Sequence, residues 1–332
     1  MSRWSSLKGA LLSILSPISV LSMVMAFSVC AQEPTPKPNV VLILVDTLRA
    51  DHLGCYGYQH NVSPNIDRLA AQSKVFTRCY SVAPWTLPSM VSIITSLYPE
   101  VHGVKTEKDR LGDKGTVLAE VLRGHGYSTG AVVTSSFLTG TWNFDRGFDF
   151  FSKKPASGHS GVTSAAATYH GRKFLKEQAK TPFFLMMHYF DPHTEYIEHG
   201  KFDFTSALGY KGPLEQGMPI IDVWPLINKK LMTDDDTAFL KALYDSEIAF
   251  TDACIGGLLE TLKEMGVFEN TLIILTSDHG EEFMDHGGLE HSRTLYEELI
   301  HVPLIIKMPN SSQPESLSIV VSVLDVFPTA LD

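Results

Sequence analysis

Short apolar runs recur along this chain and alternate with segments of helical periodicity. The run at 40–45 is continuously apolar, which is typical of a central parallel strand that is buried on both faces. Further runs occur at 130–134, 183–188, 272–277 and 302–306, and helical patterns occur at 63–72, 116–124, 163–178 and 234–265. This alternation predicts an α/β fold with a doubly wound, mainly parallel sheet that is flanked by helices.

One long connection interrupts the alternation. The stretch 197–232 is rich in glycine and proline and has no clear period, so we predict a loop that covers the functional site. Asp234, Asp235 and Asp236 begin the helical segment that follows. Because carboxylates at this position oppose the helix dipole, we interpret them as a capping feature rather than a calcium site.

The first residues have the organisation of an export signal. Arg3 and Lys8 precede an apolar run at 10–29, and small residues typical of a signal-peptidase site end at Ala31. An uncleaved anchor is one alternative, which a proline and five serines in the run disfavour, and lipidation of Cys30 is another. We predict export to the periplasm or the medium, with a signal peptide at 1–31, a proline-rich linker at 32–39 and a folded domain at 40–332.

The composition is that of a globular protein, with 44% hydrophobic and 19% charged residues among 332. Removing residues 1–31 takes away two positive charges and no negative ones, so the formal charge goes from -10 to -12. Nucleic acid is therefore excluded as a partner, since its binding needs a positive face. A membrane contact is expected only through an N-terminal lipid or anchor. A Cys55–Cys79 disulfide and three reduced packing thiols, Cys254 included, are both consistent with the sequence.

Polar side chains follow several predicted strands, at the ends where open α/β sheets place their chemistry. They are Asp46, Asp191 with His193, and Asp278 with His279, and they are joined by Thr86 before a helical segment and by His291. Neighbouring Asp and His supply two ligand types at one point, so the set predicts a metal site.

Five motifs stand in a fixed order along the chain. They are VDTLRADHLGCYG at 45–57, SPNIDRLA at 63–70, the segment 84–103, DPH at 191–193 and DHGE at 278–281. In sequence and order they resemble the sulfatase branch of the alkaline phosphatase superfamily. The resemblance runs from about residue 38 to the last residue. It implies a sulfatase-like catalytic domain at 40–332 that lacks the small carboxyl-terminal domain of that family and is truncated or ends in a short helix at 322–332.

The resemblance also implies roles for individual residues. Asp46, Asp278 and His279 would bind a metal, and Thr86 would be both a ligand and the nucleophile. A mixed oxygen and nitrogen set suits zinc or manganese better than calcium, with calcium and magnesium as the alternatives. A hydroxyl is a weak nucleophile at neutral pH, so Thr86 needs such a metal to favour its alkoxide form.

Two histidines fall at the second-site positions of the resemblance. His193 and His291 would bind another metal, an anionic oxygen or the leaving group, with Asp191 as a further candidate ligand. The spacing of twelve residues between His279 and His291 resembles that of phosphoethanolamine transferases, whose nucleophile is also threonine.

The sequence departs from the family pattern at several positions that serve formylglycine chemistry. Thr86 stands where sulfatases carry the cysteine that becomes formylglycine, and Met90 replaces the arginine that orients it. Thr47 stands where many sulfatases have a second aspartate ligand, and Ser96 replaces a signature glycine. The family's second signature, with its lysine and histidine, does not follow 126–129.

These residues predict an exported, metal-dependent hydrolase that cleaves phosphate, phosphonate or sulfate esters through a covalent Thr86 intermediate. The substrate would be a small-molecule, glycan or lipid ester. A phosphoethanolamine- or phosphoglycerol-type transferase is one alternative, although such enzymes usually sit behind several membrane helices. An inactive binding relative is the other, and the loss of arginine at Met90 favours it.

Overall fold

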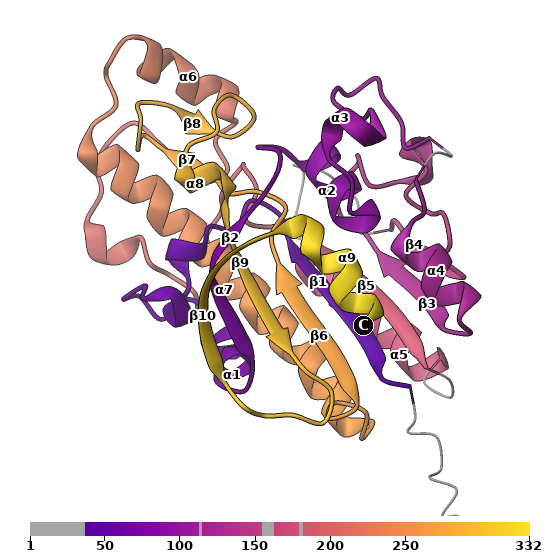
Figure 1. Cartoon of the computed structure of the whole chain (residues 1–332). Helices are drawn as coiled ribbons and strands as arrows, with labels where there is room; N and C mark the ends of the chain where they lie inside the picture. The colour runs from indigo at the N-terminus through magenta and orange to yellow at the C-terminus, as the bar shows by residue number, and fades with distance from the viewer. Residues whose placement is uncertain (1–36, 113–114, 155–162, 179–181) are drawn as a thin grey trace, which may run out of the picture. The chain divides into compact units, whose positions relative to one another are not determined.

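A computed structural model describes residues 37–112, 115–154, 163–178 and 182–332 (Figure 1). The predicted signal peptide, Cys30 and most of the linker lie outside the described residues. No helix in the described part of the chain is both long and apolar enough to cross a membrane.

An eight-stranded sheet forms the centre of the described domain, in the order β10-β2-β9-β6-β1-β5-β3-β4. All neighbouring strands run parallel except at β9, which is antiparallel to both β2 and β6. The strands are β1 Asn39–Val45, β2 Lys74–Tyr80, β3 Ser128–Val132, β4 Phe150–Ser152, β5 Phe183–Tyr189, β6 Thr271–Thr276, β9 His301–Lys307 and β10 Glu315–Ser322. A separate hairpin pairs β7 Glu282–Phe283 with β8 Leu289–Glu290.

Helices cover both faces of the sheet (Figure 1). Successive side chains of a strand point to opposite faces, so Val41 and Ile43 join one core cluster while Leu42 and Leu44 join the other. The first face carries α1 Pro64–Ala70, α5 Ser164–Gln178 and α7 Asp234–Glu264, and the second carries α2 Thr86–Thr95, α4 Leu118–Gly124 and α9 Val326–Leu331. The shorter helices are α3 Pro99–His102, α6 Ile220–Asn228 and α8 Glu297–Ile300, with 3-10 turns η1 Ala50–His52, η2 Gly54–Tyr56, η3 Gly140–Trp142, η5 Ser206–Leu208 and η6 Val323–Asp325.

The predicted fold class is confirmed: each of the five apolar runs is a strand and each of the four helical patterns is a helix. The strands β2, β4 and β10 were not predicted. β10 is mostly exposed at the sheet edge, β2 is only half-buried beside it, and β4 has three residues, so none shows a continuous apolar run. The prediction of a loop throughout 197–232 is wrong for 220–228, where α6 forms around Pro225.

Two smaller predictions are also settled. The acidic start of α7 is a cap, because the Thr233 hydroxyl accepts a hydrogen bond from the amide of Asp236 while the Asp236 carboxylate accepts from the amide of Thr233. Cys55, Cys79 and Cys254 are free thiols, so the structure favours the reduced alternative.

The close contact between β3 and α5 provides a test of the packing. A Cβ atom at Gly130 would lie 2.7 Å from ring carbons of Phe174, whereas one at Gly124 would meet nothing within 4 Å. We predict that Gly130→Ala lowers the free energy of unfolding by about 1 to 3 kcal/mol through overpacking. Gly124→Ala, at the exposed end of α4, should change it by less than about 1 kcal/mol. Urea unfolding of both variants measures the difference, and equal stabilities would contradict the predicted contact.

Candidate active site

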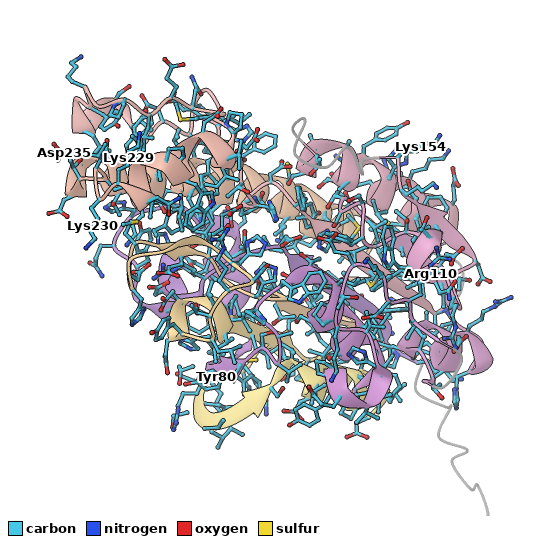
Figure 2. The ribbon with its side chains drawn as sticks, turned by 90° about the horizontal axis from the view of Figure 1, so that it is seen from above. Tyr80, Arg110, Lys154, Lys229, Lys230 and Asp235 are labelled. Atoms are coloured by element: carbon cyan, nitrogen blue, oxygen red, sulfur yellow. The ribbon has the colours of Figure 1, made fainter. Side chains whose placement is uncertain are left out.

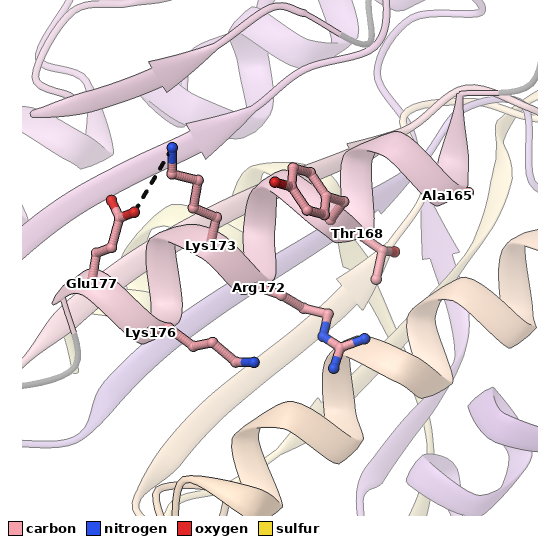
Figure 3. A pocket seen from close by; sticks show the side chains of 7 residues that line it. Ala165, Thr168, Arg172, Lys173, Lys176 and Glu177 are labelled. Atoms are coloured by element: carbon pink, nitrogen blue, oxygen red, sulfur yellow. Dashed lines mark ion pairs between the residues drawn. The ribbon is translucent and has the colours of Figure 1, made fainter.

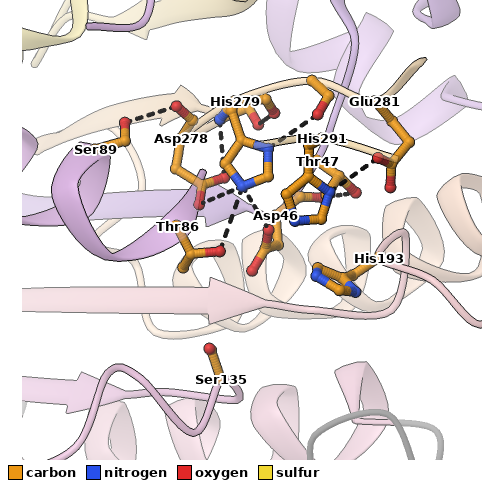
Figure 4. A network of polar contacts seen from close by, with 12 residues as sticks. Asp46, Thr47, Thr86, Ser89, Ser135, His193, Asp278, His279, Glu281 and His291 are labelled. Carbon is orange, nitrogen blue, oxygen red and sulfur yellow. Dashed lines mark hydrogen bonds and ion pairs between the residues drawn. The ribbon is translucent and has the colours of Figure 1, made fainter. Parts of the chain in front are cut away.

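The predicted site residues other than Asp191 converge at the carboxyl edge of the parallel strands (Figure 4). Asp46 directly follows β1, and Asp278 and His279 come two and three residues after the end of β6, the strand paired with β1. Thr86 is the first residue of α2, whose amino end meets the same edge. This is where open α/β sheets form their crevice, because the connections leave the strands in different directions there.

The imidazole of His279 stands at the centre of this group. Its Nε2 lies 3.4 Å from Oδ1 of Asp46, 3.4 Å from Oδ2 of Asp278 and 3.3 Å from Oγ1 of Thr86. All four side chains are buried. Residues far apart in sequence therefore present two carboxylates, a hydroxyl and a ring nitrogen to one small volume.

The hydrogen bond on the other ring nitrogen sets the tautomer of His279. Nδ1 lies 2.9 Å from the carbonyl oxygen of Gly280, which can only accept, so Nδ1 carries the proton and Nε2 carries a lone pair. Burial lowers the pKa of His279 to about 4, so the ring is neutral near pH 7. Its lone pair therefore faces the two carboxylates, and neither contact is a hydrogen bond between ionised partners.

His188, in β5, is a site residue that the sequence analysis did not identify. The Thr134 hydroxyl donates to the carbonyl oxygen of His188 at 3.0 Å, and it therefore accepts from Nδ1 of His188 at 2.8 Å. Nε2 is left with its lone pair, 3.5 Å from Oδ2 of Asp46, and burial lowers the pKa of His188 to about 4. His188 is the last residue of the apolar run 183–188, and a histidine at the carboxyl end of a predicted strand is a candidate site residue.

This donor set fits a divalent cation. Asp46 Oδ1 and Oδ2, Asp278 Oδ2 and His188 Nε2 are buried atoms without a hydrogen-bond partner, although buried polar atoms are nearly always paired. Burial and the charge of Glu281 raise the pKa of Asp46 well above its usual range, and burial and Asp46 raise the pKa of Asp278 to about 6. Ligand atoms of Asp46, His188 and Asp278 lie within 4.8 Å of one another. Metal binding would offset the cost of burying two carboxylates together.

His193 and His291 lie beside this group, as the sequence led us to expect. The ring centroid of His291 is 4.5 Å from that of His279 and 4.8 Å from that of His193. His291 follows β8, and the next amide, of Ser292, donates to the carbonyl oxygen of Pro84 at 2.8 Å. The hairpin β7-β8 thereby brings His291 back to the segment that carries Thr86.

Asp191 has a different role from the predicted one. Its Oδ1 accepts hydrogen bonds from the amide of Thr163 at 2.7 Å and from its hydroxyl at 2.5 Å, and its Oδ2 accepts from the amide of Ser164 at 2.9 Å. Both carboxylate oxygens of Asp191 therefore bind the amino end of α5, and Asp191 is no longer a candidate metal ligand. The motif placed Asp191 two residues from His193, but loop residues that are close in sequence need not face the same way.

The departures from the sulfatase pattern have visible structural consequences. Met90 is buried in the core between α2 and the sheet. The Thr47 hydroxyl donates to the carbonyl oxygen of Asp46 at 2.8 Å, in a left-handed backbone conformation with φ 55°. Ser96 ends α2, also left-handed at φ 57°, where glycine is the residue that fits without steric cost.

The rest of the surface offers other polar features, which are separate from this site. A pocket on the outer face of α5 is lined only by residues of that helix, including Arg172, Lys173 and Lys176 (Figure 3). Seen from above, Arg110 and Lys154 project at one end of the domain, and Lys229, Lys230 and Asp235 at the other (Figure 2). None of these charged side chains contributes to the group around His279.

The family model described as Sulfatase matches residues 38–332. The chain belongs to the sulfatase family. The predicted resemblance is thus confirmed, and members of this family are metal-dependent.

Known relatives match over most of this chain. The ulvan-active sulfatase of Formosa agariphila is 27% identical over 90% of this chain, which spans 62% of that protein's length. The N-acetylglucosamine-6-O-sulfatase of Bacteroides thetaiotaomicron is 25% identical over 99% of this chain and 75% of its own length. The crystal structure of the phosphonate monoester hydrolase of Agrobacterium radiobacter has the same fold, with a TM-score of 0.72, 23% identity, and coverage of 88% of this chain and 72% of that one. Ester hydrolases were the enzyme class expected from the sequence.

The metal-binding group can be tested without a substrate. We predict that the purified protein binds zinc or manganese and that Asp278→Asn loses most of this binding, because one of the converging oxygens is removed. Thr134→Val should weaken zinc affinity by about 10- to 100-fold, since it releases the ring of His188. Thr261→Val is the matched control, because the Thr261 hydroxyl is also buried and bonds only to the carbonyl oxygen of Gly257 in α7. Calorimetric titration measures all four proteins, and wild-type affinity in Asp278→Asn would refute the site.

Proposed function

We propose that this protein is an exported, metal-dependent hydrolase that cleaves phosphate, phosphonate or sulfate esters through a covalent intermediate on Thr86. The observation that carries the proposal is the position of Oγ1 of Thr86, 3.3 Å from Nε2 of His279 and beside two buried carboxylates. Family membership supports an ester substrate. Family membership does not supply the nucleophile, because Thr86 stands where sulfatases carry the cysteine that becomes formylglycine. The role of Thr86 as nucleophile is therefore our proposal.

The start of α2 favours an anion at Thr86. Thr86 is the first helical residue, and the amides of Thr86 and Leu87 have no partner within the helix, while Pro88 carries no N–H. The helix dipole adds partial positive charge at the same point. A divalent metal held by Asp46, Asp278, His279 and His188 would supply the remaining positive charge that favours the alkoxide form of Thr86 and polarises the ester.

The reaction then divides into two displacements. In the first, Oγ1 of Thr86 forms a bond to phosphorus or sulfur while the bond to the leaving oxygen breaks. The leaving oxygen keeps the electron pair and takes the proton that Nε2 of His291 has received as the Thr86 hydroxyl is converted to its alkoxide. In the second, His291 takes a proton from water as the resulting hydroxide attacks the Thr86 ester, which releases the acid and restores the alkoxide.

His193 is the second histidine that would contact the substrate. Its Nδ1 lies 2.8 Å from the carbonyl oxygen of Thr194, and its ring stacks on Phe190 with centroids 4.4 Å apart. These contacts hold the ring beside His291, where His193 would bind an anionic oxygen of the substrate. Loss of one such contact typically costs about 10² to 10³ in rate.

The chemistry of threonine favours a phosphorus substrate. A formylglycine hydrate expels sulfate by collapsing to the aldehyde, whereas a threonine ester must be cleaved by water. The higher charge of a phosphate or phosphonate group makes fuller use of the metal and the histidines. The names of the relatives also keep sulfate esters of glycans among the substrates to be tested.

Thr86 is the decisive residue for this proposal. We predict that Thr86→Ala lowers kcat by more than about 10³-fold, because the nucleophile is lost, while Thr86→Ser retains part of the activity. Thr95→Ala is the control, since Thr95 lies on the same helix and its hydroxyl bonds to the carbonyl oxygen of Val91. Rates are measured with zinc or manganese against aryl phosphate, phosphodiester, phosphonate and sulfate esters.

A mass measurement separates a reaction at Thr86 from a general loss of structure. Brief exposure to an activated ester should add the mass of one phosphoryl, phosphonyl or sulfuryl group to the peptide that contains Thr86. An alcohol acceptor that captures this group would identify the transferase alternative. Metal binding without turnover of any ester would instead indicate a binding relative and would end the proposal of hydrolysis.

Export through residues 1–31 is part of the proposal. We predict that the protein, expressed in a bacterium with its natural amino terminus, is recovered outside the cytoplasm and begins at Gln32. Amino-terminal sequencing and intact mass measure this directly. A lipid on Cys30 would appear as added mass with the chain starting two residues earlier, at Cys30, and an unprocessed Met1 would contradict cleavage.

A further inference from the structure

Glu281 is a buried carboxylate beside the proposed proton-transfer residue. Its Oε1 lies 2.9 Å from Nδ1 of His291, and its Oε2 accepts a hydrogen bond of 2.9 Å from the Tyr196 hydroxyl. We propose that Glu281 is a positioning residue that orients His291 for proton transfer at the leaving oxygen, a role that rests on the proposed function. Glu281 is the last residue of the DHGE motif, but it is not among the residues whose ligand atoms converge in the metal-binding group.

The contacts of Glu281 select one tautomer of His291. Burial raises the pKa of Glu281 to about 8, whereas the bond from the Tyr196 hydroxyl and the charge of Arg49 favour its ionised form. As an ionised carboxylate Glu281 accepts at both oxygens, so that the resting proton of His291 is on Nδ1. The two ring nitrogens diverge, and proton exchange with the ester then falls to Nε2. The ring is also confined between those of His279 and His193 (Figure 4).

The carboxylate is itself held from both sides. The carbonyl oxygen of Glu281 accepts a hydrogen bond of 3.0 Å from Arg49, whose guanidinium also pairs with Asp51 and Asp285 at 2.8 Å each. Glu281 is fully shielded from solvent, so bulk water does not compete for its oxygens. A carboxylate fixed at its backbone and at its second oxygen can hold a catalytic ring to the small tolerance that proton transfer requires.

A purely structural role for Glu281 would have different consequences. Glu281 connects the hairpin β7-β8 to the segment after β5 that carries Tyr196, and a general loosening of this connection would slow every substrate alike. Loss of an oriented acid matters only when the leaving group needs a proton. The dependence of the rate on the leaving group therefore distinguishes the two roles.

The experiment compares Glu281→Gln with wild type on a series of phosphate or phosphonate esters with 2,4-dinitrophenyl, phenyl and methyl leaving groups. We expect kcat/KM to fall by about 10² to 10³ for the methyl ester and by less than about tenfold for the dinitrophenyl ester. His291→Gln should show the same pattern, and the double variant should be no slower than His291→Gln. Equal losses across the series, or additive losses in the double variant, would overturn the inference.

Two further variants serve as controls. Glu247 is also a buried carboxylate that pairs with a histidine, with 2.5 Å between its Oε2 and Nε2 of His199. Glu247→Gln should leave the leaving-group dependence as in wild type. If Glu281→Gln does not fold, Tyr196→Phe removes only the bond to Oε2. Its loss in kcat/KM should also be larger for the methyl ester than for the dinitrophenyl ester, although smaller than in Glu281→Gln. An equal loss for all leaving groups in Tyr196→Phe would then refute the inference.

A second readout needs no turnover. In protein labelled with ¹⁵N-histidine, we expect the His291 signal of wild type to show the Nδ1-protonated form and to change tautomer in Glu281→Gln, with His291→Gln providing the assignment. An Nε2-protonated ring in wild type contradicts the positioning role. An inert wild type with the expected tautomer would refute hydrolysis but not the orientation of His291 by Glu281.

Discussion

Two buried carboxylates and two imidazole lone pairs face one another at the carboxyl edge of the sheet, and each of them is an acceptor. Such a group repels itself unless a proton or a cation lies among its members. Asp46 and Asp278 meet because β1 and β6 are paired in register, with Leu44 opposite Thr276. The pairing of the two central strands thus places together acceptor groups whose mutual repulsion a divalent metal would remove.

Hydrogen bonds around the site hold these acceptor groups in place. Ser277 accepts a hydrogen bond from the amide of Leu48 and donates one to the carbonyl oxygen of His279, which locks the loop after β1 to the loop after β6. The Ser89 hydroxyl donates to the carbonyl oxygen of Asp278 at 2.6 Å and ties the first turn of α2 to the same loop. Because these bonds involve backbone and hydroxyl groups, the site geometry does not depend on flexible charged side chains.

The exchange of cysteine for threonine changes what the remaining residues must accomplish. In the proposed mechanism the Thr86 hydroxyl has no internal means of expelling the bound acid, so the reaction depends on the groups that activate water and protonate the leaving oxygen. His291, held by Glu281, lies where that work would be done. The loss of arginine at Met90 is consistent with this shift, since no formylglycine needs to be oriented.

The sequence by itself determined the fold class and most of the site. Continuous apolar runs mark strands covered on both faces, and the residues that follow them lie at one edge because parallel strands end there. Asp46, Thr86, Asp278, His279 and His291 were all accessible to this reasoning. The edge strands β2 and β10 were not, because a half-exposed strand carries no continuous apolar signal.

Only the tertiary structure decided the roles that depend on side-chain direction. It turned Asp191 toward the amino end of α5, brought His188 against Asp46, and placed Glu281 behind His291. A sequence states which residues are neighbours along the chain, whereas a buried acceptor finds its partner across strands and hairpins. The direction of each side chain is set by the packing of elements that join only when the whole domain has formed.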